Sequence, residues 1–306
     1  MARIALVTCR ALPQLSDDDR LLLAPLAQLG VAAQPVLWDD PRQDWTGYDG
    51  VILRSTWDYH TRISEFDEWL ARLTDEGARV WNAIAVLRWN SDKRYLLELG
   101  KRDVPIVPTT IISRDRVVDL SHVLRTNGWT KAVVKPTISA TAYQTWLTEP
   151  ATAERDQRQL LAMMMHSDVM VQPFMPEIVR DGEYSFVFFA GEFSHCYRKQ
   201  PKPGDYRTQS DFGATYKRHA APPEWIAQAR SILGKLPQPM LYARVDCIAQ
   251  GAKLVLMELE LIEPALGLRL VPDAPLMFAR AIAQAVQRSL GGGAQTWIQS
   301  PAPRLS

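Results

Sequence analysis

The chain contains the runs YARVDCI at residues 242–248 and LVLMELEL at residues 254–261, and these two runs decide its fold. Both are typical of β-strands, and Gln250-Gly251-Ala252 between them is typical of a hairpin turn. Because side chains alternate across a sheet, we expect the odd-numbered residues to form one apolar face. These residues are Val245, Cys247, Val255, Met257, Leu259 and Leu261.

The even-numbered residues of the same hairpin place Arg244, Asp246, Glu258 and Glu260 on the opposite face. A three-residue loop pairs even positions with even positions, so Arg244 is expected roughly across from Glu258, with Asp246 as a neighbour. Three carboxylates on a half-buried sheet are costly unless something compensates their charge. Oxygen-rich clusters of this kind suit Mg²⁺. A solvated salt-bridge face is the alternative, because exposed charge pairs are common and contribute little.

Length and composition exclude several classes of protein. The 306 residues predict two or three domains or subdomains. A net charge of +1 argues against nucleic-acid binding, and no segment approaches the apolar length of a membrane span. The cysteines Cys9, Cys196 and Cys247 lack metal-ligand spacing and are expected to be buried, reduced thiols. Since Met1–Thr8 is typical of a strand and not of a signal peptide, we expect a cytoplasmic protein.

The first third of the chain alternates strands and helices, which predicts a small parallel sheet with covered faces. The predicted strands are Ile4–Thr8 and Gly50–Arg54, and the predicted helices are Asp17–Leu29 and Ser64–Leu73, with Ser64 as the N-cap. In such sheets, ligands bind beyond the carboxyl ends of the strands. There the chain carries Arg54-Ser55-Thr56-Trp57-Asp58-Tyr59, which is polar enough to line a site. Loops also collect polar residues without function, so both interpretations stay open.

The middle of the chain presents two lysines in unusual positions. Lys93 falls in the first turn of a predicted helix, Asp92–Leu99, capped by Ser91, where a cation opposes the helix dipole. Lys135 ends the apolar strand Ala132–Lys135, and a snorkelling lysine is the plain alternative to a functional one. Further strands are predicted at Ile106–Ile112, Val169–Phe174, Glu183–Ala190 and Phe193–Lys199, further helices at Val117–Thr126, Glu224–Leu236 and Ala274–Leu290, and a long polar loop at Gln200–Lys217.

From about Asn90 to Pro264 the chain resembles the ATP-grasp superfamily of ATP-dependent ligases, because several motifs occur in the family's order. Lys93 in Asn90-Ser91-Asp92-Lys93 and Lys135 in Val-Val-Lys-Pro resemble the two nucleotide lysines. Val171–Glu177 resembles the hinge whose backbone contacts the adenine, and Gly182-Glu183 resembles the segment whose acid binds the ribose. Arg244-Val245-Asp246 resembles the motif that meets the transferring phosphate and magnesium, and Glu258 resembles the second metal acid.

The resemblance implies an α/β fold, α+β in its C-terminal part, with an N-terminal Rossmann-like pre-ATP-grasp domain. We expect this domain at residues 1–84 and an ATP-grasp domain of two subdomains at 85–290, with a hinge near 172–176. Residues 291–306 are rich in Gly, Pro and Ser and are expected to form a loose tail.

The resemblance also implies ATP and two Mg²⁺ ions as cofactors. The metal ligands would be Asp246, Glu258 and Glu260; the catalytic cations Arg244, Lys199 and Arg207; the nucleotide-binding residues Lys93, Lys135, Ser139, Thr141, Gln172, Phe174 and Glu183; and the substrate-binding residues Arg54, Ser55, Thr56 and Tyr59. Two departures from the family pattern stand out. The phosphate-covering loop Thr137–Thr145 has no glycine, and Glu260 stands where many members carry asparagine, with Glu263 as a rival ligand.

Three stretches resemble, more narrowly, the cyclo-ligases of D-cycloserine biosynthesis and their relatives, which close O-ureido-D-serine into a ring with ATP. They are Leu53–Tyr59; Gly191–His195 with Lys199 and Gly204–Arg207; and Glu258–Pro264. The implied activity is an antibiotic-biosynthesis ligase that forms a C–N bond through an acylphosphate on a small amino-acid-like substrate. The alternatives are a ligase joining two molecules and a non-catalytic nucleotide-binding relic. His195 is expected to be structural rather than a general base, and a homo-oligomer is compatible with the sequence.

Overall fold

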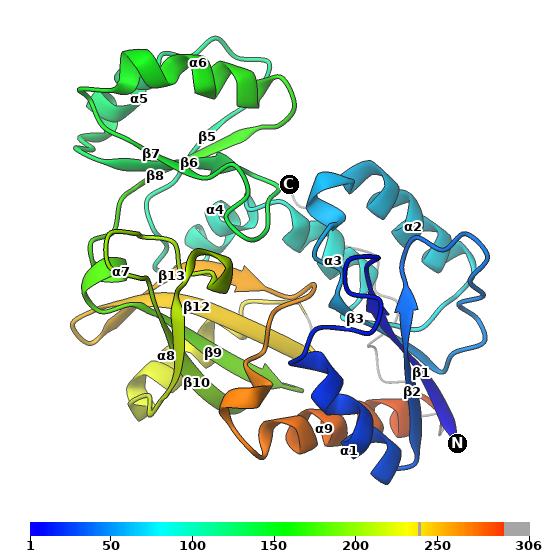
Figure 1. Cartoon of the computed structure of the whole chain (residues 1–306). Helices are drawn as coiled ribbons and strands as arrows, with labels where there is room; N and C mark the ends of the chain where they lie inside the picture. The colour runs from blue at the N-terminus through cyan, green and yellow to red at the C-terminus, as the bar shows by residue number, and fades with distance from the viewer. Residues whose placement is uncertain (238–239, 291–306) are drawn as a thin grey trace.

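Three β-sheets with helices packed against them make up the protein (Figure 1). The computed structural model describes residues 1–237 and 240–290. The predicted tail at 291–306 lies outside these described residues. The first sheet is parallel and the other two are antiparallel, so the predicted α/β class with an α+β C-terminal part is confirmed. The predicted domain boundaries stay a prediction.

The parallel sheet has the strand order β2-β1-β3-β4. Its strands are β1 (Ala2–Thr8), β2 (Val31–Leu37), β3 (Gly50–Ser55) and β4 (Val80–Trp81), and its helices are α1 (Leu23–Gln28), α2 (Ile63–Asp75) and α3 (Ile84–Ser91). The predicted helix Asp17–Leu29 is shorter in the structure, a 3-10 turn at Asp19–Leu22 followed by α1. Pro25 explains this difference, because it lacks the N–H that would continue the helical ladder toward the N-terminus.

Two predicted helix caps are wrong. Helix α2 begins at Ile63, so Ser64 lies inside it and caps nothing. Ser91 ends α3, where its hydroxyl donates to the Arg88 carbonyl at 2.8 Å, instead of starting the next helix. Helix α4 begins only at Tyr95 and ends at Gly100, so Lys93 lies between two helices. Its N–H donates to the Thr137 carbonyl at 2.9 Å, a tertiary bond that holds the break and that no local pattern encodes.

The central antiparallel sheet has the order β11-β10-β9-β12-β13. Its strands are β9 (Glu183–Phe189), β10 (Glu192–Gln200), β11 (Thr215–His219), β12 (Tyr242–Gln250) and β13 (Lys253–Glu260), and α8 (Pro223–Leu233) and α9 (Ala274–Leu290) accompany it. The bounds of α9 agree with the prediction. Strand β11 enters the predicted polar loop Gln200–Lys217; it is an edge strand with little burial, so it lacks an apolar alternation.

The register of the β12–β13 hairpin differs from the prediction. Gln250 pairs with Lys253 across a two-residue turn, and a bulge between Asp246 and Cys247 then shifts the pairing by one residue. Arg244 therefore pairs with Glu260, not with Glu258, and Glu258 pairs with Asp246. The charged side chains still share one face, because the bulge restores the even-to-even pairing that a two-residue turn would have removed.

The bulge also changes the predicted apolar face. Val245, Cys247, Leu259 and Leu261 are buried as predicted, but Val255 and Met257 are only half-buried. On the turn side of the bulge, Leu254 and Leu256 face the core instead, since one extra residue reverses the alternation.

The third sheet, with order β5-β8-β6-β7, has its own layer of helices. It consists of β5 (Thr110–Ile112), β6 (Ala132–Pro136), β7 (Trp146–Thr148) and β8 (Val169–Pro173), covered by α5 (Leu120–Asn127) and α6 (Ala153–Met164). Figure 1 shows this unit, which we call the lid, standing above the other two sheets. Its apolar cluster contains lid residues alone, such as Leu124, Val134, Leu160 and Val171.

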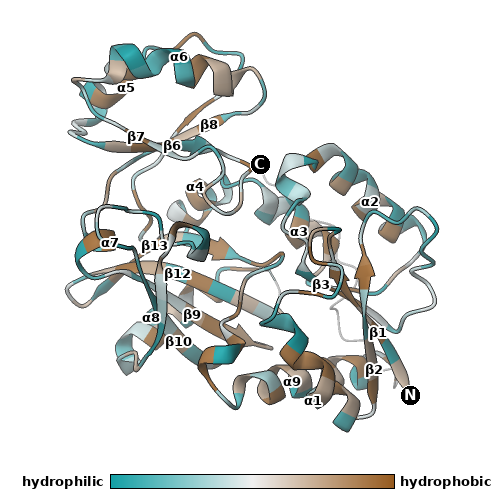
Figure 2. Ribbon diagram, in the orientation of Figure 1, coloured by the Kyte–Doolittle hydropathy of each residue, from teal (hydrophilic) through white to brown (hydrophobic). Residues whose placement is uncertain are grey.

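The parallel and central sheets, by contrast, share one apolar cluster. It joins Ile4 of β1 and Leu26 of α1 to Phe278 and Ile282 of α9. In Figure 2 the brown of β3 contrasts with the teal on the outer helices α5 and α6.

The three cysteines are free and buried, as predicted. Among residues 1–237 and 240–290, no helix is both long and apolar enough to cross a membrane.

Candidate active site

A cavity of about 240 Å³ lies where the lid, the central sheet and the segment after β3 meet. The predicted site residues that line it are Tyr59, Lys93, Lys135, Ser139, Thr141, Gln172, Glu183, Lys199, Arg207, Arg244, Glu258 and Glu260. Segments far apart in the sequence thus converge on one hollow. Asp246 lies fully buried beneath it, whereas Phe174, Arg54, Ser55 and Thr56 do not line it.

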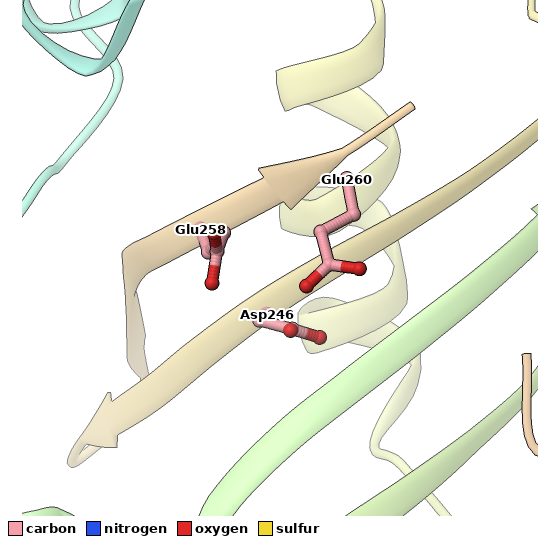
Figure 3. A group of neighbouring side chains, drawn as sticks. All are labelled: Asp246, Glu258 and Glu260. Carbon is pink, nitrogen blue, oxygen red and sulfur yellow. The ribbon is translucent and has the colours of Figure 1, made fainter. Parts of the chain in front are cut away.

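Three carboxylates form a compact group on the cavity side of the hairpin (Figure 3). Asp246 of β12 and Glu258 and Glu260 of β13 each offer one oxygen, and these oxygens lie within 4.8 Å of one another. Carboxylate oxygens are the ligands that Mg²⁺ prefers, so the donor set fits that ion. Among the described residues, the group includes Glu260 and not its rival Glu263.

Cations neutralise this acidic group. The Lys199 ammonium and the Arg244 guanidinium each donate to Asp246 Oδ2 at 2.8 Å, and the Ser185 hydroxyl donates to Oδ1 at 2.7 Å. Arg244 also pairs with Glu260, and Lys93 Nζ lies 3.1 Å from Glu258 Oε1. Buried charges persist only when they are paired in this way.

The electrostatic environment separates the pKa values of the acids. Burial alone would raise the pKa of Asp246, but Arg244 and Lys199 hold it below its usual range. Burial raises the pKa of Glu260 to about 8, which Arg244 only partly opposes. For Lys135, burial lowers the pKa, and the negative charge of Glu258 opposes this effect. Such a divided set of pKa values is typical of a functional site.

The predicted nucleotide residues come from both the central sheet and the lid. Glu183 accepts from Lys199 Nζ at 2.8 Å and from the Thr208 hydroxyl at 2.9 Å. The Gln172 amide donates to the Thr109 hydroxyl at 2.9 Å. Phe174 does not line the cavity, whereas its neighbours Pro173 and Met175 do; its N–H donates to the Lys131 carbonyl, and its role toward a nucleotide stays a prediction.

The glycine-free loop Thr137–Thr145 closes the cavity from the lid side. Thr141, Ala142 and Gln144 have φ values of 50°, 55° and 50°, in the left-handed region that favours glycine. The Lys93 ammonium donates to the Ser139 carbonyl from below. At the loop tip, the Tyr143 ring lies 5.2 Å from the ring of His60, so the loop also contacts the segment after β3.

The predicted substrate residues divide into two groups. Arg54 is 0% exposed and donates to Asp19 Oδ1 at 2.9 Å and to the Pro264 carbonyl at 2.6 Å. Ser55 donates to the same Asp19 carboxylate, and Thr56 is buried. Arg54 therefore meets a carboxylate of the protein and not of a ligand, a partner that sequence spacing does not reveal. Tyr59 does line the cavity, together with Trp57 of the same predicted stretch.

The remaining predicted residues lie as follows. Lys199 bridges Glu183 and Asp246, as described above. Arg207 pairs with Asp205 at 2.8 Å, and its guanidinium lies 3.6 Å from the centre of the Phe212 ring. His195 does not line the cavity; its Nε2 lies 2.8 Å from the Leu266 carbonyl oxygen, which fits the expected structural role.

Comparison with known proteins gives one consistent result. A family model described as the N-terminal domain of D-cycloserine synthetase DcsG matches residues 4–82. The chain is 32% identical over 304 residues to the cycloserine biosynthesis protein DcsG of Streptomyces lavendulae, covering 93% of this chain and 99% of that protein. It resembles the crystal structure of D-cycloserine synthetase DcsG with a TM-score of 0.84 and 28% identity, covering 93% of this chain and 100% of the other.

More distant ligases share the fold. The D-alanine–D-alanine ligase of Bacillus anthracis in complex with ATP gives a TM-score of 0.68 at 13% identity, with 95% of this chain and 98% of that chain covered. An ATP-grasp protein of the RimK type from Sphaerobacter thermophilus gives 0.68 at 20% identity, with 92% and 99% covered. The predicted ATP-grasp fold is thereby confirmed.

Proposed function

Because this chain belongs to the D-cycloserine synthetase family of ATP-grasp ligases, we propose that it cyclises a small amino acid with ATP and Mg²⁺. The proposed substrate is O-ureido-D-serine, and the product is D-cycloserine or a close analogue. The observation that carries the proposal is the group of Asp246, Glu258 and Glu260 beside the cations of the cavity. A protein that only bound nucleotide would need fewer carboxylates, which argues against a non-catalytic relic.

The proposed chemistry has three steps. An oxygen of the substrate carboxylate attacks the γ-phosphorus of ATP, which forms an acylphosphate and releases ADP. The oxygen-bound nitrogen of the ureido group then attacks the carbonyl carbon, losing its proton as phosphate leaves, and water finally removes the carbamoyl group from the ring nitrogen as carbon dioxide and ammonia. The protein's contribution is to hold the reactants in line and to stabilise the negative charge that moves between them.

Each residue of the cavity has a proposed part in these steps. Asp246, Glu258 and Glu260 would hold Mg²⁺, which supplies charge neutralisation for the phosphates. Arg244 and Lys199 would then turn from the carboxylates toward the transferring phosphoryl group, with Arg207 at the cavity edge. Lys93, Lys135, Ser139 and Thr141 would bind the phosphates, Glu183 the ribose, and the backbone around Gln172 and Pro173 the adenine.

A single substrate molecule is favoured over two because proximity is then built into the substrate and no second amine has to bind. Trp57 and Tyr59 line the same cavity as the acids. The likeness to D-alanine–D-alanine ligase supports the fold alone, since the identity is 13%.

The test is an incubation with ATP, Mg²⁺ and O-ureido-D-serine and no other amine. We expect ADP, phosphate and a cyclic product identified by its mass. The Asp246→Asn variant serves as the inactive control. Release of ADP only after a separate amine is added would support the intermolecular ligase instead.

A further inference from the structure

The segment Leu261–Leu266, directly after β13, is irregular backbone held almost entirely by side chains. Each of its six carbonyl groups accepts a hydrogen bond: Leu261 from Asn82 (2.8 Å), Ile262 from Tyr242 (2.7 Å), Glu263 from Trp57 (3.1 Å), Pro264 from Arg54 (2.6 Å), Ala265 from Tyr197 (2.8 Å) and Arg244 (2.9 Å), and Leu266 from His195 (2.8 Å). Buried carbonyls need partners, but strand pairing would normally supply them. Here the donors come from separate parts of the fold.

This network gives Arg54 and His195 a role. Neither lines the cavity, yet both fix the backbone that follows the metal-binding hairpin. Arg54 is itself fixed, because Asp19 binds its guanidinium and the ring of Tyr242 lies 4.9 Å below it. Hydrogen bonds to every carbonyl of this short segment fix its backbone, and a fixed backbone holds a side chain in the position that ligand binding requires.

That side chain is Glu263. It is 7% exposed and lines the cavity. By contrast, Glu183, Asp246, Glu258 and Glu260 each meet a lysine or arginine. Within the described part of the chain, Glu263 has no ion pair and its carboxylate accepts no hydrogen bond. A buried carboxylate without a partner is costly, so a ligand cation is the expected compensation.

The surroundings of Glu263 fit a small organic cation. Tyr59 and Trp57 line the same cavity, the Trp57 indole N–H donates to the Glu263 carbonyl, and aromatic faces attract ammonium groups. Burial raises the pKa of Tyr59, and the negative charges of Glu263, Glu260 and Glu258 add to this rise. Glu263 also stands apart from the three carboxylates whose oxygens converge, so the geometry does not favour it as a ligand of the same metal ion.

We propose that Glu263 binds the α-ammonium group of the amino-acid substrate and so selects substrates that carry one. The inference rests on the proposed function, because it assigns the same cavity to an amino acid. Arg54, Trp57 and His195 are positioning residues that act through the backbone of Leu261–Leu266. The carboxylate end of the substrate would lie toward Arg244, where the phosphoryl group arrives.

The test compares two ligands by isothermal titration calorimetry with Mg²⁺ and a non-hydrolysable ATP analogue present. One ligand is O-ureido-D-serine, and the other is the same molecule with hydrogen in place of the amino group. We expect the wild-type protein to bind the amino compound roughly ten- to a hundredfold more tightly, the scale of one charged hydrogen bond. In Glu263→Gln this preference should vanish, whereas Glu263→Asp should keep part of it.

Two controls make the result specific. Glu224→Gln removes a carboxylate from the first turn of α8, outside the cavity, and should leave the preference unchanged. Binding of Mn²⁺, followed by electron paramagnetic resonance, should be the same in Glu263→Gln and the wild type. Equal binding of both ligands by the wild type, binding of neither, or a weakened Mn²⁺ affinity in Glu263→Gln would overturn the assignment.

The proposed function is tested separately by turnover. A wild-type protein that distinguishes the two ligands but forms no cyclic product would contradict the cyclisation and leave Glu263 as an ammonium site. A protein that forms the cyclic product without distinguishing the ligands would contradict the role of Glu263 alone.

Discussion

At the scale of single residues, the site depends on how carboxylates and cations are paired. Asp246 is held by Lys199, Arg244 and Ser185 at once, whereas Glu263 has no such partner in the described ranges. The two acids are therefore prepared for different ligands. An acid between cations can exchange them for a metal ion, and an acid beside aromatic rings can receive an ammonium group.

Removing the charge of a metal-binding acid should abolish turnover and leave the fold intact. For Asp246→Asn and Glu258→Gln we expect ADP release to fall on the order of a hundredfold or more, the scale of lost charge stabilisation. The rate of ADP release and the circular dichroism spectrum provide the measurement. Near-wild-type rates in both folded variants would contradict the metal role.

Lys135 should contribute to nucleotide affinity. Its ammonium is half-buried at the end of β6, and burial lowers its pKa, so a phosphate would be a better partner than water. Lys135→Ala should weaken binding of an ATP analogue by roughly 1–3 kcal/mol, as measured by calorimetric titration. Lys131→Ala is the control, because that ammonium lies over the Phe174 ring outside the cavity lining. Equal affinities of both variants would return Lys135 to a snorkelling role.

His195 should make the protein sensitive to acid. Burial lowers the pKa of this imidazole below its usual value, although its bond to the Leu266 carbonyl partly opposes the shift. The unfolded chain therefore binds the proton more readily, and the contribution of His195 to stability is lost as the pH falls below about 6.5. The melting temperature of the wild type should drop more steeply from pH 7.5 to 5.5 than that of His195→Gln. Parallel curves would contradict the prediction.

At the scale of elements, the glycine-free loop is the clearest departure from what its family predicts. Ala142 adopts a left-handed backbone conformation, whereas Ala140 in the same loop does not. Ala142→Gly should relieve steric crowding of about 1–2 kcal/mol and thereby offset the added entropy of the unfolded chain. Ala140→Gly gains no such relief and should be the less stable variant in urea unfolding. If Ala142→Gly were less stable than Ala140→Gly, the loop would not be held in this conformation.

Patterns in the sequence predicted elements well where one period ran undisturbed, as in β3 and α9. They failed where a contact distant in sequence decided the local structure. Next to the bulge in β12–β13, the N–H of Leu256 donates to the Pro105 carbonyl, and the Leu256 carbonyl accepts from the Val107 N–H. The break at Ser91-Asp92-Lys93 depends on Thr137. The periodicity of a segment cannot predict these hydrogen bonds, because the partners lie far away in the sequence.

The same distinction applies to the site. Asp246, Glu258 and Glu260 could be predicted together because alternation on a hairpin brings them to one face. Arg54 could not be placed, because its partner Asp19 lies in another element, and a buried ion pair has the same local sequence as a ligand-binding arginine. The sequence indicates Glu263 only as a rival metal ligand, since its lack of a cation partner is visible in three dimensions alone.

At the scale of the whole molecule, the active site is assembled from units with different degrees of independence. Most of the lid's apolar residues form a core of their own, although Met170 and Ile111 pack against the central sheet, whereas the parallel and central sheets share one cluster. Hydrogen exchange should therefore show the lid strands β6 and β8 opening as one unit at lower free energy than β1 and β9. Uniform protection across all four strands would contradict this separation.

The shared core joins the first strand of the chain to the last described helix, and this has a consequence during synthesis. A ribosome releases β1 and α1 first, but Ile4 and Leu26 find their apolar partners Phe278 and Ile282 only when nearly all of the protein has been translated. Until then, the nascent N-terminal region exposes apolar surface to solvent, and we expect chaperones to bind it. A stalled chain that ends at residue 270 should thus be cut readily by protease in its first thirty residues, and a released full-length chain should resist.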